Sequence, residues 1–494
     1  MMSALERTAV SVTSDGRTER GQFSGFGVNT MQAALTPLTP PPKELAFASK
    51  SSPWNIIWKM LGIVLLLYII TQSFALAAIG LVDGDAFLTT FSLLCMTPFL
   101  AIFIYSRRPK LTHVIVATPD ENGNIQHNLP NFRVLNTPSP TRFTHHLIRD
   151  SPPLEMPKTS TLWIVFSLTI VFAALGLLPV MVSDNPAWLL LALFIGVPAW
   201  LLGFSLPVHA WWAFSTRHFQ LVTTKLEGER MLIAGMLSTI PAIVINSLLF
   251  PLLLVAIGIT STNSGSLGEF LILSVSAPVG EEVCKALFVL SLYKLIDSPK
   301  RGFQIGFSVG LGFALLENLQ YIMISLSGGA ISYSFTAIVR GVGSIPGHAF
   351  WTGLSGVSIG WYLCSKRGIR QSESNNQNWM VFDSTTGEVV NTQNDLTELG
   401  KTIRGWLYKP YDKIWNLPRN PLTGVSIAVA GHSLWNGSSW LVSTIFSGTE
   451  IWVQLIVNLA WILIMVGGLW YVGREILASV MHLPHSIEFN MPAN

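Results

Sequence analysis

The chain has 494 residues, of which 50% are hydrophobic and only 12% are charged, with a formal net charge of +3 at pH 7. Soluble globular domains carry roughly 25% charged residues, so this composition excludes an ordinary soluble protein. It indicates an all-α polytopic membrane protein whose surroundings are the lipid bilayer. The small net charge gives no reason to expect a nucleic acid as a partner.

Residues 1–52 are polar and rich in Ser, Thr, Gly and Pro, which predicts a disordered cytoplasmic tail. About ten apolar segments follow, each long enough to cross a bilayer as a helix of about 20 residues. They run over residues 56–81, 86–106, 161–182, 187–213, 231–260, 268–294, 302–326, 336–364, 422–446 and 451–473.

The segments group into larger units separated by two long polar loops. In chain order we expect a transmembrane hairpin, a cytoplasmic loop, transmembrane helices, helices that carry buried polar residues, a second cytoplasmic loop, two further transmembrane helices and a cytoplasmic tail. Their ranges are 53–106, 107–160, 161–260, 266–364, 365–420, 421–474 and 475–494. Both loops contain strand-like pieces, and WMVFDSTTGEVVN in the second predicts a small β-hairpin.

The loops differ in their content of Lys and Arg, and this difference predicts the orientation. One set of connections contains no Lys or Arg at all, whereas the loops between them are basic. Because basic loops stay in the cytoplasm, we expect both termini on the cytoplasmic side. The connections without Lys or Arg are 82–85, 183–186, 261–267, 327–335 and 447–450.

The sixth apolar segment carries three charged residues in its middle, Glu281, Glu282 and Lys285. A charge at that depth costs about 2.5–3.5 kcal/mol on insertion scales, so an intramembrane carboxylate is a candidate functional residue. Glu281 and Lys285 are four residues apart, which places them on one helix face where they can pair. Pro278 and Gly280 precede them and predict a break in the helix.

The next three segments carry polar residues at similar heights. Counted from the segment ends, the positions agree within about two helical turns. Four helices can therefore bring their carboxylates, imidazoles and amides into one buried cavity. These residues are Glu317 and Asn318 in the seventh segment, His348 in the eighth, and His432 and Asn436 in the ninth, while Arg340 lies at the outer end of the eighth segment.

Two local patterns sharpen this expectation. His432 and Asn436 are four residues apart, so the amide can orient the imidazole or stabilise an oxyanion. In the eighth segment, Gly341, Gly343 and Pro346 precede His348, which predicts a kink there and a working helix that begins near Val342.

The chemistry that such a set supports is the activation of water. A glutamate in an apolar pocket can act as a general base, and a histidine opposite can share the water. We expect Glu281 to be the base, with Glu282 in that role if the pairing of Glu281 with Lys285 is purely structural. Alternatively, His348, His432 and Glu317 could bind one Zn²⁺ with an open position for water.

Four stretches in the same order are similar to motifs of a known family. They are Glu281-Glu282-Val283-Cys284-Lys285, the GFALLEN run ending in Glu317 and Asn318, the RGVGSIPGHAFWTGLSG run around His348, and His432-x-x-x-Asn436. Over roughly residues 270–450 the chain resembles the PrsW family of intramembrane proteases, which is related to the CAAX-processing and bacteriocin-processing membrane proteases. The chain departs from the CAAX pattern at Lys285 and Glu317, and both departures are PrsW-like.

The resemblance implies a glutamate-dependent endopeptidase of the regulated-proteolysis type, of a kind also expected to use a metal. Its substrate is expected to be a membrane-anchored protein, and its location the bacterial plasma membrane. Residues 266–364 are then catalytic helices of a four-helix core. The expected catalytic residues are Glu281, Glu282, His348, His432 and Asn436, supported by Lys285, Glu317, Asn318 and Arg340.

Three other functions share parts of this pattern. Gly353-Leu354-Ser355-Gly356, followed by His432, looks like a rhomboid serine-protease arrangement, but it leaves the glutamates unexplained. A proton- or ion-coupled transporter could use buried Glu, His and Lys as a relay, although polar groups are then expected in both halves of the chain. A catalytically silent scaffold is the third alternative.

Overall fold

The computed structural model describes residues 52–108, 111–129, 133–149, 153–182, 187–219, 221–367, 381–382, 389–390, 402 and 405–483. The expected tail at residues 1–52, except Ser52, lies outside this part of the chain, as do most of residues 365–403 and the end of the expected tail at 475–494. The chain divides into two units, residues 51–375 with 404–494 and residues 1–50 with 376–403.

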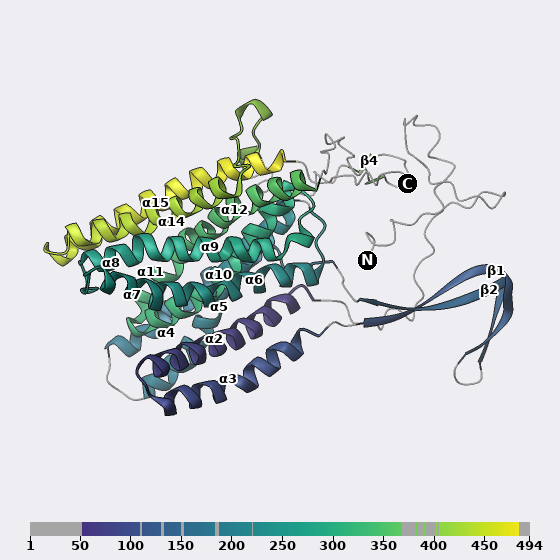
Figure 1. The fold of residues 1–494 in the computed structure, drawn as a ribbon, viewed down its shortest axis with the longest axis horizontal. Coiled ribbons are helices and arrows are strands. Elements are labelled where there is room, and N and C mark those ends of the chain that lie inside the picture. Colours follow the sequence, from purple (N-terminus) through teal and green to yellow (C-terminus); the bar gives the residue numbers. More distant parts are fainter. Residues whose placement is uncertain are drawn as a thin grey trace. The chain divides into compact units, whose positions relative to one another are not determined.

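The larger unit is built of long helices that lie side by side (Figure 1). Within the described residues, seven helices are long and apolar enough to cross a membrane. The fold is therefore that of an all-α polytopic membrane protein, as predicted. The elements are α2 (Asn55–Val82), α3 (Ala86–Ser106), α4 (Thr159–Val182), α5 (Ala187–His218), α6 (Lys225–Val244), η3 (Ile245–Leu249), α7 (Phe250–Ala256), α8 (Leu267–Leu271), η4 (Ile272–Ser276), α9 (Ala277–Ser291), η5 (Tyr293–Leu295), α10 (Pro299–Ser327), α11 (Gly329–Val339), η6 (Arg340–Ser344), α12 (Ile345–Lys366), η8 (Tyr411–Lys413), α14 (Pro421–Ile445) and α15 (Ile451–Met481).

The expected number of ten spans stays a prediction. Three of the expected spans, formed by α8–η4–α9, α11–η6–α12 and α14, are not among the seven apolar helices. These three carry the charged, imidazole and small residues of the predicted cavity, which lower their apolar character. Apart from Glu317 and Asn318 on α10, the candidate functional residues thus lie on the helices that are not among the seven.

Both strand predictions are confirmed. In the first loop, β1 (Leu111–Leu129) pairs antiparallel with β2 (Arg133–Arg149), from Leu111 opposite Arg149 to Leu129 opposite Arg133. In the second loop, β3 (Val381–Phe382) and β4 (Val389–Val390) form the expected short hairpin.

The helix breaks expected before Glu281 and His348 are present as π-helical turns. The turn η4 precedes α9, which has Pro278 in its first turn, and η6 precedes α12, which has Pro346 in its first turn. Proline lacks an N–H, so it leaves a carbonyl of the preceding turn without its helical partner. The wider π turn accommodates the proline, and such turns are frequent at functional sites.

Side chains from other helices satisfy the carbonyls of these turns. Asn436 donates its amide to the carbonyl of Leu273 in η4, with 3.1 Å between nitrogen and oxygen. In η6, the indole N–H of Trp211 donates to the Gly341 carbonyl at 3.1 Å and that of Trp470 to the Val342 carbonyl at 2.8 Å. The two breaks are therefore fixed by contacts with α5, α14 and α15.

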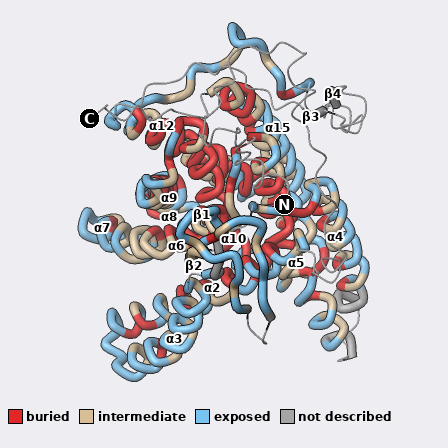
Figure 2. The backbone as a smooth tube through the Cα atoms, turned by 90° about the vertical axis from the view of Figure 1, so that its right-hand side faces the viewer, coloured by how far each residue is buried: buried red, intermediate tan, exposed pale blue. Residues whose placement is uncertain are grey.

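The helix α10 lies at the centre of the buried region, and Figure 2 shows buried residues gathered on α10 and α12. Their backbones approach each other closely through glycines spaced four residues apart on α10. A Cβ atom on Gly306 would lie 2.3 Å from the carbonyl oxygen of Thr352, and one on Gly310 would lie 2.3 Å from that of His348. Small residues permit this approach between membrane helices, and here they set the distance between Glu317 and His348.

We predict that Gly306→Ala separates α10 from α12 and lowers the stability of the protein by about 1–3 kcal/mol, because the methyl group meets backbone that cannot move aside. Gly62→Ala is the matched control. Gly62 lies inside α2, and a Cβ atom on it would have no neighbouring atom within 4 Å, so alanine there is expected to be neutral or to stabilise by up to about 1 kcal/mol. Thermal unfolding in detergent measures both, and equal melting temperatures for the two variants would contradict the prediction.

Candidate active site

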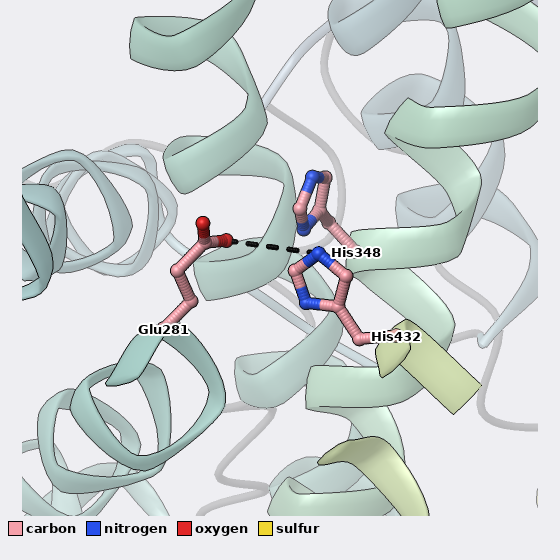
Figure 3. Close-up of side chains that lie close together, drawn as sticks. All are labelled: Glu281, His348 and His432. Atoms are coloured by element: carbon pink, nitrogen blue, oxygen red, sulfur yellow. Dashed lines mark ion pairs between the residues drawn. The ribbon is translucent and has the colours of Figure 1, made fainter. Parts of the chain in front are cut away.

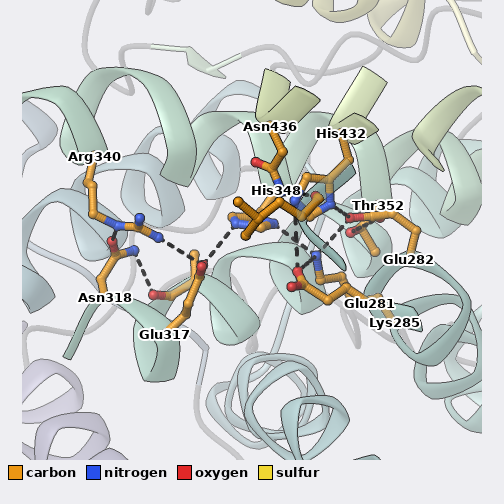
Figure 4. Close-up of polar contacts among 12 residues, drawn as sticks. Glu281, Glu282, Lys285, Glu317, Asn318, Arg340, His348, Thr352, His432 and Asn436 are labelled. Carbon is orange, nitrogen blue, oxygen red and sulfur yellow. Dashed lines mark hydrogen bonds and ion pairs between the residues drawn. The ribbon is translucent and has the colours of Figure 1, made fainter. Parts of the chain in front are cut away.

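The polar residues expected at one height meet between four helices, as predicted. Figure 4 shows them as a row of side chains linked by hydrogen bonds and ion pairs. Each helix contributes from the face that points into the bundle. The residues are Glu281, Glu282 and Lys285 from α9, Glu317 and Asn318 from α10, Arg340 from η6, His348 and Thr352 from α12, and His432 and Asn436 from α14.

Lys285 lies at the middle of this row and is fully buried. Its Nζ atom is 2.7 Å from Oε1 of Glu282, 3.3 Å from Oε2 of Glu281 and 2.8 Å from Nδ1 of His348. The ammonium also lies over the ring of Phe313, 3.9 Å from its centroid. All three of its protons thus have acceptors, which compensates for the loss of water around a buried charge.

Glu282 is also fully buried, and both of its carboxylate oxygens are occupied. Oε1 accepts from Lys285 and lies 3.1 Å from Nδ1 of His432, while Oε2 accepts from the Thr352 hydroxyl at 3.1 Å. This carboxylate ties together α9, α12 and α14, and it has little capacity left for a substrate or water.

Glu281 is the more open member of the pair, since 12% of its side chain is exposed. Besides Lys285, Glu281 has His432 within ion-pair distance, with Nε2 of the ring 3.9 Å from Oε2 of Glu281 (Figure 3). That separation is too long for a direct hydrogen bond. One water oxygen can bridge the two atoms, because hydrogen bonds of about 2.8 Å to each span such a gap.

His348 is held on both sides of its ring. Nδ1 faces Lys285, and Nε2 is 2.9 Å from Oε2 of Glu317. The same carboxylate oxygen lies 2.9 Å from Nη2 of Arg340. The guanidinium in turn donates from Nε to Oδ1 of Asn318 and lies 3.8 Å from the centroid of the Tyr321 ring.

His432 is fixed in its plane by an indole. The ring of Trp351 stacks on it with 4.9 Å between centroids and 15° between planes. His348 stands perpendicular to it at 5.0 Å. Gly431 makes room for this arrangement, because a Cβ there would lie 2.6 Å from Nε1 of Trp351.

The structure does not bring Asn436 to the imidazole of His432 as expected. Its amide instead donates to the Leu273 carbonyl in η4, one turn before the helix that carries the glutamates. The i, i+4 spacing would allow Asn436 to contact the ring of His432. The Leu273 carbonyl lacks a helical partner because of Pro278, and it accepts the hydrogen bond of the amide instead. Its expected catalytic role therefore stays a prediction without a supporting contact.

Three of these residues form a group that could hold a metal ion. One ligand atom each from Glu281, His348 and His432 lies within 4.8 Å of the other two. Two imidazoles and one carboxylate are a known donor set for catalytic zinc, so the residues fit such an ion. The expected third ligand was Glu317, which instead lies beyond His348 and pairs with Arg340.

Three further residues of the site lie within the quoted motifs but were not expected to contact the polar groups: Thr352, Trp351 and Phe313. Thr352 follows His348 by four residues, and Phe313 precedes Glu317 by four, so helical spacing places each beside a recognised residue. Trp351 is one of 17 tryptophans, and nothing in the chain marks it as a neighbour of His432. Only its position against α14 reveals the stack.

The fold and site define a class, an integral membrane protein with paired carboxylates and imidazoles buried among its helices. Residues 229–382 match the family model described as PrsW family intramembrane metalloprotease. The match agrees with the family that the motifs resemble. The match includes Glu281, Glu317 and His348 but ends before His432. No curated protein and no solved structure matches the chain.

The contacts of the two neighbouring glutamates predict different effects on stability. We expect Glu282→Ala to destabilise the protein by about 3–5 kcal/mol, because it leaves the buried ammonium of Lys285 without its shortest ion pair. Glu281→Ala removes a longer contact of a partly exposed side chain and is expected to cost clearly less. Thermal unfolding of both variants in detergent tests the order, and a larger loss for Glu281→Ala would contradict it.

Proposed function

We propose that this membrane peptidase is an intramembrane endopeptidase that hydrolyses a peptide bond of a membrane-anchored protein with water activated by Glu281. The observation that carries the proposal is the unequal occupation of the three clustered carboxylates. Glu282 accepts hydrogen bonds at both oxygens and Glu317 pairs with Arg340 and His348, whereas Glu281 is partly exposed and faces an imidazole across a gap of 3.9 Å.

The reaction uses the residues as follows. A water in the gap donates one proton toward Glu281 and a second hydrogen bond toward Nε2 of His432. Glu281 takes the first proton as the water oxygen attacks the scissile carbonyl carbon, and it later returns this proton to the leaving amide nitrogen. His432 keeps the water in place because Glu282 holds its Nδ1 and Trp351 holds its plane. General base catalysis of this kind contributes about 10²–10⁴-fold.

The family description includes a metal, and the residues that would hold it are Glu281, His348 and His432. If bound there, Zn²⁺ would lower the pKa of a water ligand to near neutral and, as a Lewis acid, would polarise the scissile carbonyl. Lys285 Nζ lies 2.8 Å from His348 Nδ1, so the ammonium already occupies one nitrogen of this ring.

We expect Glu281→Gln to lower cleavage of a co-expressed membrane-anchored substrate by at least about 100-fold without loss of inserted protein, because the amide cannot take a proton from water. His348→Ala and His432→Ala are expected to abolish cleavage as well. The matched control is Glu269→Gln. Glu269 lies on α8 and accepts from the Trp440 indole and the Gly265 N–H, contacts that a glutamine oxygen can still accept. Immunoblots of the cleaved and uncleaved substrate give the result, and normal cleavage by Glu281→Gln would exclude the proposed base.

Metal analysis of the purified protein decides between the two modes of water activation. If Zn²⁺ assists, the wild type is expected to carry about one ion per chain, the double variant His348→Ala/His432→Ala none, and 1,10-phenanthroline to stop cleavage. If Glu281 acts alone, both proteins are expected to be free of metal and cleavage to resist the chelator.

We also propose that both termini lie in the cytoplasm, as the distribution of Lys and Arg predicts. Ser447 and Asp412 are exposed positions on opposite sides in this topology. On intact cells, an impermeant maleimide is expected to label Ser447→Cys and not Asp412→Cys, whereas both react after lysis. The three native cysteines are buried or partly buried, and the unsubstituted protein measures their background. Labelling of Asp412→Cys on intact cells would show that the orientation is the reverse of the one proposed.

A further inference from the structure

Glu317 occupies a place in the site that the proposed reaction does not use. It lies on the side of His348 opposite to Lys285, so the imidazole stands between the carboxylate and the ammonium (Figure 4). Its Oε2 atom is 2.9 Å from Nε2 of His348, and Lys285 Nζ is 2.8 Å from Nδ1. Glu317 is therefore next to a candidate catalytic histidine but separated from Glu281 by the ring.

The donors and acceptors around His348 determine which ring nitrogen carries the proton. A lysine ammonium has three donors and no acceptor, so Nδ1 of His348 must accept from Lys285. The proton of the neutral ring is then on Nε2, where a carboxylate is the appropriate partner. Glu317 lies on that side of the ring, with Oε2 2.9 Å from Nε2, and the Nδ1 lone pair stays on the side of Lys285.

Glu317 is itself held in position by its neighbours. Arg340 approaches the same oxygen to 2.9 Å, and the Nε of Arg340 donates to Asn318, whose own amide nitrogen donates to the Ala314 carbonyl at 2.7 Å. These contacts link the carboxylate to η6 and to the backbone of α10. The ring of His348 is thereby tied to two helices besides its own.

The second histidine of the site shows the same arrangement. Nδ1 of His432 lies 3.1 Å from Oε1 of Glu282, which leaves Nε2 turned toward Glu281. Each imidazole thus has one carboxylate beside one of its nitrogens, while the other nitrogen faces Lys285 in His348 and Glu281 in His432. A carboxylate behind a histidine fixes the orientation of the ring, and its removal typically costs about 10–100-fold in activity or in metal affinity.

We propose that Glu317 is a positioning residue that holds the Nε2 proton of His348, and that it is neither the general base nor a metal ligand. The expected effect of Glu317 on the rate of cleavage rests on the proposed peptidase function. The effect of Glu317 on the orientation of the His348 ring does not depend on that function. Arg340 and Asn318 are the groups that keep Glu317 in place.

The test compares Glu317→Gln with Glu317→Leu. The oxygen of glutamine can still accept from Nε2, so we expect Glu317→Gln to lower kcat by less than about tenfold. Leucine cannot accept, and we expect Glu317→Leu to lower kcat by about 10–100-fold with KM unchanged. A glutamine variant as inactive as the leucine variant would show that Glu317 transfers a proton, which overturns the proposal.

A second measurement reads the ring directly and needs no cleavage. In protein labelled with ¹⁵N-histidine, the His348 ring is expected to give a hydrogen-bonded Nε2 proton signal in the wild type and in Glu317→Gln. That signal is expected to be lost in Glu317→Leu and kept in the control Glu269→Gln, whose glutamate has its hydrogen bonds with Trp440 and Gly265. His348→Gln assigns the signal, and its persistence in Glu317→Leu would overturn the proposal.

The two proposals fail in different ways. If the wild type cleaves no membrane-anchored substrate but the ring signal depends on Glu317 as described, the positioning role stands and the peptidase function falls. If cleavage depends on Glu281 but not on Glu317, and the ring signal is unchanged in Glu317→Leu, the positioning role falls alone. Metal analysis adds a third arm, since loss of bound metal in Glu317→Gln to the level of His348→Ala would make Glu317 a ligand.

Discussion

The arrangement of this site depends on one buried ammonium group. Lys285 is fully enclosed and gives its three protons to Glu281, Glu282 and His348, so it holds two carboxylates and an imidazole at hydrogen-bond distance inside the helix bundle. Removing one member of such a group leaves a buried charge without a partner, which is strongly unfavourable. Three carboxylates face two cations, Lys285 and Arg340, so the cluster retains one negative charge when the histidines are neutral. That charge favours one more proton or a metal ion at the site.

Two prolines adjust the helices to this cluster. Pro278 and Pro346 each follow a π-helical turn, and they stand at the starts of α9 and α12, which carry Glu281 and His348. The carbonyls of these turns receive hydrogen bonds from Asn436, Trp211 and Trp470. Unsatisfied backbone groups are costly in lipid, so these side chains stabilise the breaks. The rotation of α9 and α12 about their axes, and with it the direction of Glu281 and His348, is thereby linked to α5, α14 and α15.

A division of roles among the three glutamates follows from their surroundings. Glu282 has both oxygens engaged and orients His432, Glu317 stands behind His348 with Arg340, and Glu281 is left partly exposed between the two rings. The three side chains are chemically identical carboxylates. They differ in the number of neighbouring donor groups and in their exposure, and these differences decide which carboxylate can bind a water. The close approach of α10 and α12 through Gly306 and Gly310 sets one of these distances.

The sequence by itself determined the membrane fold, the helix breaks before Glu281 and His348, and the set of polar residues that meet, because hydropathy, proline and the 3.6-residue period act within one helix. It could not determine which groups touch between helices. Asn436 was expected beside His432 and contacts the Leu273 carbonyl, and Glu317 was expected in a metal group in which the structure places Glu281. Thr352 and Trp351 were not expected to contact the polar groups. Contacts between helices depend on the rotation and height of each helix. The packing at glycines and prolines and the buried ion pairs set both, and these exist only in the tertiary structure.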